Sequence, residues 1–254
     1  MFLPHEDRAR RSNMARFVAR CEGVVGRSLA DYAALQRFAT EEARMFWRLL
    51  LEHCEIVHGG DACVVLAGDD VQTARFFPDV TLNYAENLLR TMSPEVEASA
   101  AVVYRGEDGA RLELTRAEVR ARVRQAAAAL EAKGLRAGDR VVAVARNHPD
   151  ALVAALAVTS LGATWSSVSP DMGLESVVGR FGPLEPAMLL AHAEYTFQGR
   201  TTSLEPLVAA LARALPSLRV VAQLDALTPE GAAGASVDGP SARFPLDHPL
   251  FIIF

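Results

Sequence analysis

Two short apolar runs between residues 139 and 192 constrain the fold of this chain most strongly. RVVAVA at 140–145 and AMLLA at 187–191 are rich in β-forming residues and apolar without alternation. That pattern is typical of strands that helices cover on both faces. Strand and helix patterns alternate at intervals near 30 residues, which predicts an α/β fold with a doubly wound, mostly parallel sheet.

Turn residues mark the helix boundaries inside this stretch. His148 and Pro149 are expected to start a helix, because proline tolerates the first helical turn, and Gly162 ends it where a left-handed residue is wanted. Ser169 is the expected cap of the next helix, with Pro170 just inside it. Ligands of doubly wound sheets bind beyond the carboxyl ends of the strands. The loops after Val168 and His192 are therefore the candidate site.

Composition excludes several classes of protein. Half of the 254 residues are apolar and 22% are charged, as in globular proteins. The net charge of −5 comes with no basic block, so neither nucleic acid nor a membrane is an expected partner. Residues 1–13 carry charges where a secretory signal needs an apolar core, and the apolar helix 151–161 is too short to span a bilayer. We expect a cytoplasmic protein.

Neither the cysteines nor the histidines have the spacing of metal ligands. The three cysteines form no C-x-x-C motif and are expected to be reduced, as in the cytoplasm. None of the six histidines pairs with another at ligand spacing. His148, His192 and His248 stand at element boundaries, which indicates turn or cap roles. No metal site is expected.

Other segments carry clear local signals. Residues 1–27 are charged and irregular, and we expect a surface arm followed by a helical cap. Residues 100–104 and 111–114 flank a polar turn and predict a β-hairpin. Thr115 and Glu118 form the T-x-x-E capping box of a following helix.

The C-terminal residues combine a predicted linker with an apolar strand. Residues 225–247 are rich in Gly, Ala, Pro and Ser, which is typical of a flexible linker. HPLFIIF at 248–254 is predicted to be a buried strand. Because chain ends normally lie exposed, a chain that stops inside such a strand is expected to be cut short.

Three ordered segments resemble acetoacetyl-CoA synthetases (acetoacetate–CoA ligases), a branch of the adenylate-forming acyl-CoA synthetase superfamily. They are the 32–53 segment with its Phe46-Trp47 pair, FFPDVTLNYAENLL at 76–89, and SLGATWSSVSPDMG followed by GRFGPLEPAMLL. The resemblance implies an incomplete N-terminal domain of the adenylate-forming fold. Its expected parts are an arm and helical cap at 1–98, an α/β subdomain at 99–224, and a linker with a truncated strand at 225–254.

The resemblance also implies an activity and its cofactors. In this family ATP with Mg2+ activates a carboxylate as an acyl-adenylate, and the thiol of coenzyme A then displaces AMP. The substrate would be acetoacetate or a similar short acid. The phosphate loop, the acyl pocket and a catalytic lysine of relatives lie beyond the position of Phe254. We therefore expect no catalytic residue here, a chain that is inactive alone, and a possible complementary C-terminal chain as partner.

Six residues match family positions near coenzyme A: Phe197, Gln198, Gly199, Arg200, Gly162 and Ala163. The resemblance implies that Arg200 pairs with a phosphate of coenzyme A, for which a guanidinium fork is suited. Gly199 permits close backbone approach, while Phe197 replaces a residue that can be basic in acetyl-CoA enzymes. Gly162 is explained equally well as a helix terminator.

Two other interpretations stay open. The chain is alternatively a non-enzymatic module that binds coenzyme A or docks on another chain, as a split or degenerate half of a synthetase. Serines at 166, 167 and 169 suggest a nucleophile, but no G-x-S-x-G elbow surrounds them.

Overall fold

The computed structural model describes residues 5–70, 72–107, 109–228 and 242–254. It divides into two compact units, residues 1–81 and residues 82–254. We call the first the N-terminal unit and the second the parallel-sheet unit, and each is described by itself. The boundaries expected at 98/99 and 224/225 stay predictions.

The described residues of the N-terminal unit form four helices followed by four short strands, the last of which ends one residue beyond the unit. Their bounds are α1 Glu6–Arg10, α2 Asn13–Val25, α3 Tyr32–Glu41, α4 Ala43–His53, β1 His58–Gly60, β2 Leu66–Ala67, β3 Arg75–Phe76 and β4 Val80–Leu82. The irregular structure expected at 1–27 is wrong for the described residues, because α1 and α2 are regular helices. Phe17 and Cys21 lie one turn apart on α2 and are both buried, so the charges of this segment belong to an amphipathic helix.

Aromatic side chains pack at the centre of the helical cap. Phe46 on α4 lies edge-on to Phe17, with 5.5 Å between ring centroids, and near Phe38 at 6.0 Å. Trp47 contacts Phe46 and Phe76 in the same manner, although it stays 37% exposed. The packing role predicted for the Phe46-Trp47 pair is confirmed.

The parallel-sheet unit begins with small helices and a hairpin and continues as a strand-helix alternation. Its first elements are α5 Tyr84–Leu88, α6 Pro94–Glu97, β5 Ala100–Arg105, β6 Arg111–Thr115 and α7 Arg116–Ala132. The alternation then runs β7 Arg140–Val144, α8 Pro149–Ser160, β8 Thr164–Val168, α9 Leu174–Phe181, η1 Gly182–Leu184, β9 Met188–Ala191, β10 Glu194–Phe197, β11 Arg200–Ser203, α10 Glu205–Ala214, β12 Val220–Gln223, η2 Asp225–Leu227 and β13 Phe244–Pro245.

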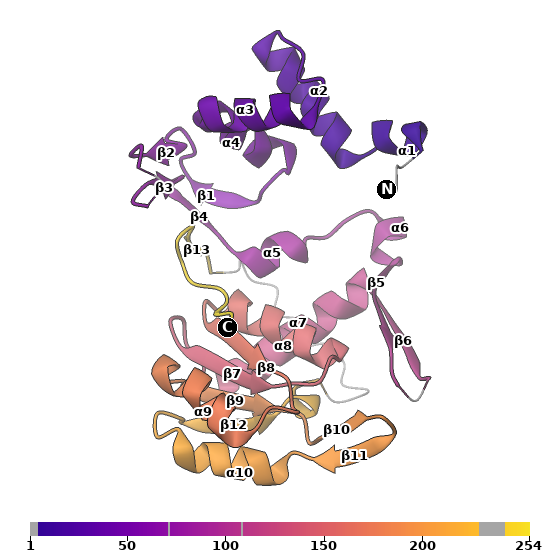
Figure 1. The fold of residues 1–254 in the computed structure, drawn as a ribbon, viewed down its shortest axis with the longest axis vertical. Coiled ribbons are helices and arrows are strands. Elements are labelled where there is room, and N and C mark those ends of the chain that lie inside the picture. The colour runs from indigo at the N-terminus through magenta and orange to yellow at the C-terminus, as the bar shows by residue number, and fades with distance from the viewer. Residues whose placement is uncertain (1–4, 71, 108, 229–241) are drawn as a thin grey trace. The chain divides into compact units, whose positions relative to one another are not determined.

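Four parallel strands form the predicted sheet, in the order β12-β9-β7-β8. The register places Val142 opposite Ser166 on one side and Leu189 on the other. In Figure 1, α7 and α8 lie on one side of this sheet and α9 and α10 on the other. The doubly wound, mostly parallel fold is therefore confirmed.

Alternate residues of the strands face different helices. Val141 and Ala143 of β7 belong to a core with α7 and α8, whereas Val142 and Val144 belong to a core with α9 and α10. All four are fully buried. Burial on both faces explains the continuous apolar run at 140–145.

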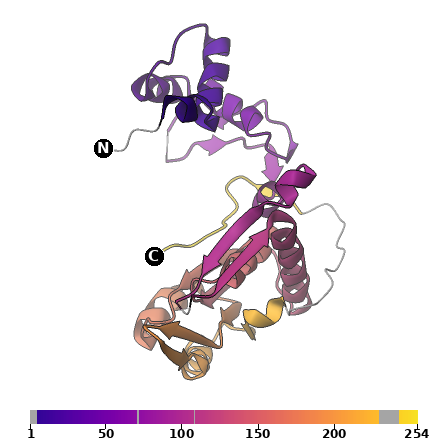
Figure 2. The same cartoon turned by 90° about the vertical axis from the view of Figure 1, so that its right-hand side faces the viewer.

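The predicted hairpin and capping box are confirmed. β5 and β6 pair antiparallel, and Figure 2 shows them alongside α7. The Thr115 side chain accepts a hydrogen bond from the Glu118 backbone N–H at 3.2 Å, and the Glu118 carboxylate accepts one from Thr115 N–H at 2.7 Å.

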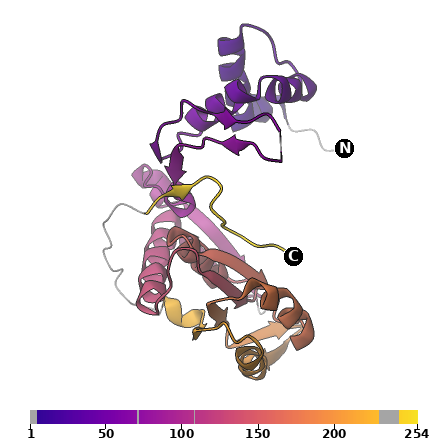
Figure 3. The same cartoon turned by 90° about the vertical axis from the view of Figure 1, so that its left-hand side faces the viewer.

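The C-terminal residues differ from the predicted buried strand. Trp165 N–H of β8 donates to Leu250 O and Ile252 N–H donates to Trp165 O, both at 2.9 Å, which forms one isolated parallel bridge. Phe251, Ile253 and Phe254 are exposed. The predicted linker falls mostly on residues 229–241, outside the described residues. The first residues of the predicted linker, Asp225–Leu227, form the short helix η2, which is the yellow turn in Figure 3 and contacts α7.

Ser169 and Pro170 do not begin a helix, contrary to prediction. α9 starts at Leu174 with Gly173 as its N-cap, and Ser169 O accepts a hydrogen bond from Met172 N–H in a turn. The His148 cap and Pro149 start of α8 are confirmed, as is Gly162 in the left-handed region (φ 73°).

Candidate functional site: a crevice at the carboxyl ends of the strands

A crevice of about 430 Å3 lies where the parallel strands end. It is lined by Tyr104, Arg105, Glu107, Arg146, Asn147, Ser169, Pro170, Asp171, Tyr195, Thr196 and Phe197. Arg146 follows β7, Ser169 follows β8, and Tyr195 belongs to β10, just after β9. Parallel strands end at one edge of the sheet, so residues distant in sequence meet there. The prediction that the loops after Val168 and His192 form the candidate site thus agrees with the position of this crevice.

A tight turn between β10 and β11 forms one wall. Gln198 and Gly199 both have positive φ, 51° and 74°, as the two central residues of a type I′ hairpin turn require. The Gln198 backbone N–H donates to Glu107 Oε2 at 2.9 Å. A carboxylate from the β5–β6 loop therefore holds this turn in place.

The structure brings only part of the predicted coenzyme A residues together. Phe197 lines the crevice and is 58% exposed, and Gln198, Gly199 and Arg200 continue around the adjoining turn. Gly162 and Ala163 instead precede β8, at the amino end of the sheet, and both are buried.

Packing explains the glycine of the predicted pair at the amino end. A Cβ atom on Gly162 would overlap the Phe244 ring, and its φ of 73° favours glycine as well. His248 Nε2 lies 2.8 Å from Gly162 O. These contacts account for Gly162 as a helix terminator and close-packing residue, separate from the crevice.

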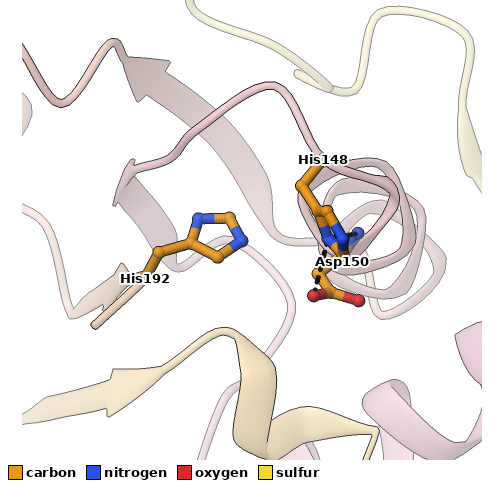
Figure 4. A group of neighbouring side chains, drawn as sticks. All are labelled: His148, Asp150 and His192. Atoms are coloured by element: carbon orange, nitrogen blue, oxygen red, sulfur yellow. Dashed lines mark hydrogen bonds and ion pairs between the residues drawn. The ribbon is translucent and has the colours of Figure 1, made fainter. Parts of the chain in front are cut away.

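Beside the crevice lies a cluster of three polar side chains that the sequence did not indicate, of which His192 is buried and the other two are half-buried. His148, Asp150 and His192 each place a potential ligand atom within 4.8 Å of the others. Figure 4 shows the His192 ring pointing one nitrogen toward the His148–Asp150 pair. His148 Nδ1 lies 2.8 Å from Asp150 Oδ2. This spacing alone would allow a cation between the three side chains.

The hydrogen bond to the other nitrogen of His192 argues against a cation. The Arg146 backbone N–H donates to His192 Nδ1 at 3.2 Å, so the lone pair of the neutral ring is on Nδ1 and the proton is on Nε2. A protonated Nε2 cannot bind a metal. Among the described residues this buried Nε2 has no hydrogen-bond partner. His192 Nε2–H is therefore a hydrogen-bond donor without an acceptor, and the three side chains are not arranged as the ligands of a metal ion.

The environment keeps His192 neutral. Burial and then the positive charge of Arg146 lower the pKa of His192 to about 4, against the opposing effects of Asp225 and Asp150. Burial acts to raise the pKa of Asp150, but the hydrogen bond and charge of His148, with further electrostatic effects of His192 and Arg122, outweigh it and lower that pKa. Asp150 thus remains a carboxylate beside a neutral His192.

Arg146 is the other residue that has a buried side-chain nitrogen without a hydrogen-bond partner. Its Nε is buried and has no partner in the described part of the chain, and its side chain lines the crevice. Sequence reasoning missed Arg146. The available signal was a charged residue directly after the buried run of β7.

The serines in this region do not resemble nucleophiles. The Ser166 hydroxyl is buried and donates to Ile252 O at 2.8 Å, which serves the pairing of that segment with β8. Ser169 lines the crevice within its turn. The geometry is suited to binding an anionic or aromatic ligand rather than to covalent catalysis.

The described residues contain no helix whose length and apolar character would let it cross a membrane.

Similarity to known proteins extends over the whole chain. The acetoacetyl-coenzyme A synthetase of Rhizobium meliloti is 35% identical over 268 residues, covering 100% of this chain and 41% of the relative. The acetoacetyl-CoA synthetase of Gallus gallus is 30% identical, covering 98% and 40%. The solved structure of acetoacetyl-CoA synthetase from Streptomyces lividans matches with a TM-score of 0.87 at 32% identity, over 99% of this chain and 40% of that one.

The chain thus spans about 40% of the length of these relatives. Its fold is that of their N-terminal portion, as the resemblance implied. A family model described as AMP-binding enzyme matches residues 93–254, which include the whole crevice. This chain belongs to the AMP-binding enzyme family.

Proposed function

We propose that this chain serves as the N-terminal part of an acetoacetate–CoA ligase. The reaction would join acetoacetate and coenzyme A with conversion of ATP to AMP and pyrophosphate, through an acyl-adenylate. The observation that carries the proposal is similarity over the whole of this chain to acetoacetyl-CoA synthetases, at 35% identity to the Rhizobium meliloti enzyme, of which it covers 41%. ATP and Mg2+ belong to the complete enzyme, and a short acid such as acetoacetate is its substrate.

The crevice supports a partial site for coenzyme A. Arg146 lines the crevice with a guanidinium group, which suits a phosphate oxygen. Tyr195 and Phe197 present aromatic surface on which an adenine ring can stack. Arg200, on the adjoining turn, is exposed and would contact a phosphate from outside. Coenzyme A would bind through these groups, and its thiol would accept the acyl group in the complete enzyme.

The purified 254-residue chain is expected to release no pyrophosphate from ATP and acetoacetate. Co-expression with a chain that supplies the remaining part of a synthetase should restore ligase activity, measured as acetoacetyl-CoA formed. Steady pyrophosphate release by the chain alone would refute the proposal that adenylation requires the remaining part of a synthetase. Failure of the reconstituted pair, with coenzyme A still bound by this chain, would favour the non-enzymatic binding module.

A further inference from the structure

The chain segment 242–252, which we call the strap, lies along the outer edge of β8, the last strand in the order of the parallel sheet. Its pairing with β8 is a single parallel bridge between Trp165 and Phe251. Ser166 adds a side-chain contact, because its hydroxyl donates to Ile252 O at 2.8 Å. Strands inside the sheet pair over four or five residues each, so the strap is joined to the sheet by far fewer backbone hydrogen bonds.

The buried side chain of Asn83, just before α5, fastens the start of the strap. Its amide nitrogen donates to Ala242 O at 2.7 Å and to Ser160 O, at the end of α8, at 2.8 Å. Its amide oxygen accepts the Glu86 N–H at 3.1 Å and caps α5. Asn83 is 1% exposed, and buried amides in native proteins are normally hydrogen-bonded. Asn83 thus links three parts of the chain that are distant in sequence.

An ion pair beside Asn83 holds the next residue of the strap. Arg243 Nε and Nη2 each donate to one carboxylate oxygen of Glu86, both at 3.1 Å. The side chains of Arg243 and Glu86 are 32% and 23% exposed. A bidentate pair in a partly enclosed place is stronger and more directional than a contact between two mobile surface charges. We call Asn83 and Glu86 together the clamp.

The remainder of the strap is less enclosed. Phe244 lies over Gly162 and stacks on His248, with 4.5 Å between ring centroids. Phe251 contacts the Tyr84 ring edge-on but is 41% exposed. Because the strap runs parallel to β8, it leads from the clamp toward the carboxyl edge of the sheet, where the crevice lies.

We propose that the clamp is a positioning device that keeps the strap on β8, and that the strap opens as a unit of its own while the parallel sheet stays folded. Segments with few buried apolar contacts and few backbone hydrogen bonds open at a lower free energy than the core. Opening bares the edge of β8 up to Val168, the residue before Ser169 in the crevice wall. The clamp therefore controls access to the sheet edge beside the crevice, whatever ligand the crevice binds.

The test is hydrogen exchange of the full 254-residue chain, followed amide by amide by NMR. The Ile252 amide, which donates to Trp165 O, reports on the strap, and the amides of β9, a strand with a neighbour on each side, report on the sheet. Ile252 should exchange faster than β9 in the wild-type chain. Glu86→Ala and Arg243→Ala should each speed the exchange of Ile252 about tenfold or more, through loss of charge-assisted hydrogen bonds.

Two further variants and a control test whether the clamp residues act together. The double variant Glu86→Ala, Arg243→Ala should exchange no faster at Ile252 than either single variant, because both remove the same interaction. Asn83→Asp separates clamping from capping, since its carboxylate still accepts the Glu86 N–H but cannot donate to Ala242 O, and it should also speed exchange. Glu205→Ala, which removes an exposed acidic residue from the first turn of α10, should change nothing at Ile252.

Equal exchange rates for Ile252 and the β9 amides in the wild-type chain would overturn the inference, because the strap would then open only when the whole sheet unfolds. If Glu86→Ala and Arg243→Ala fold and leave the exchange of Ile252 unchanged, the clamp is refuted. These two substitutions are at partly exposed positions, so they decide the matter even if Asn83→Asp does not fold.

Discussion

Acidification should destabilise the parallel-sheet unit through His192. The pKa of His192 in the folded chain is about 4, whereas an unfolded histidine has a pKa of about 6.5. Because the folded pKa is depressed, the unfolded chain binds more protons between these values, and stability falls as the pH drops from 6.5 toward 4. At pH 5 the difference corresponds to about 1.5 pKa units, or about 2 kcal/mol.

Fluorescence of one tryptophan can report this change. The chain has two tryptophans, and Trp47→Phe leaves Trp165, which is buried on β8 within the parallel sheet. Urea unfolding of this variant should show a free energy of unfolding about 2 kcal/mol lower at pH 5 than at pH 7 from His192, in addition to any change from other groups.

His192→Asn in the same background is the matched control. The asparagine amide oxygen can accept the Arg146 N–H as Nδ1 does, but it does not titrate. In this variant the decrease in the free energy of unfolding from pH 7 to pH 5 should be about 2 kcal/mol smaller, whatever the stability of the variant at pH 7. If the free energy of unfolding decreases equally in the proteins with His192 and with His192→Asn, the neutral buried imidazole is not the cause of the pH dependence.

Three further results are expected. Thr115→Ala should lower the unfolding free energy by about 1 kcal/mol in chemical denaturation, because the helix loses its capping acceptor, while Thr115→Ser should cost little. Gly162→Ala should cost about 1–2 kcal/mol for the left-handed backbone, plus displacement of Phe244, and an unchanged melting temperature would contradict this packing. A thiol reagent should label Cys54 before Cys21, since burial raises the pKa of Cys21; equal rates in the folded chain would be inconsistent with it.

Local signals were sufficient for much of the scaffold. The apolar runs at 140–145 and 187–191 predicted β7 and β9, because strands buried on both faces need apolar side chains in both directions. The T-x-x-E box predicted the start of α7, because its two hydrogen bonds involve only residues three apart. Ser169 failed as a cap, since a serine and a proline suit a turn equally well and the helix start at Gly173 lies beyond that turn.

The site required the tertiary structure. From the sequence, the loops after Val168 and His192 could be predicted as the place where ligands bind, because parallel strands end at a common edge. The sequence could not show that Arg146, whose Nε has no hydrogen-bond partner in the described part of the chain, lines that place beside His192, 46 residues further along the chain. Whether a charged side chain is paired depends on which distant groups the parallel register of β7 and β9 brings into contact. Only the folded chain decides that.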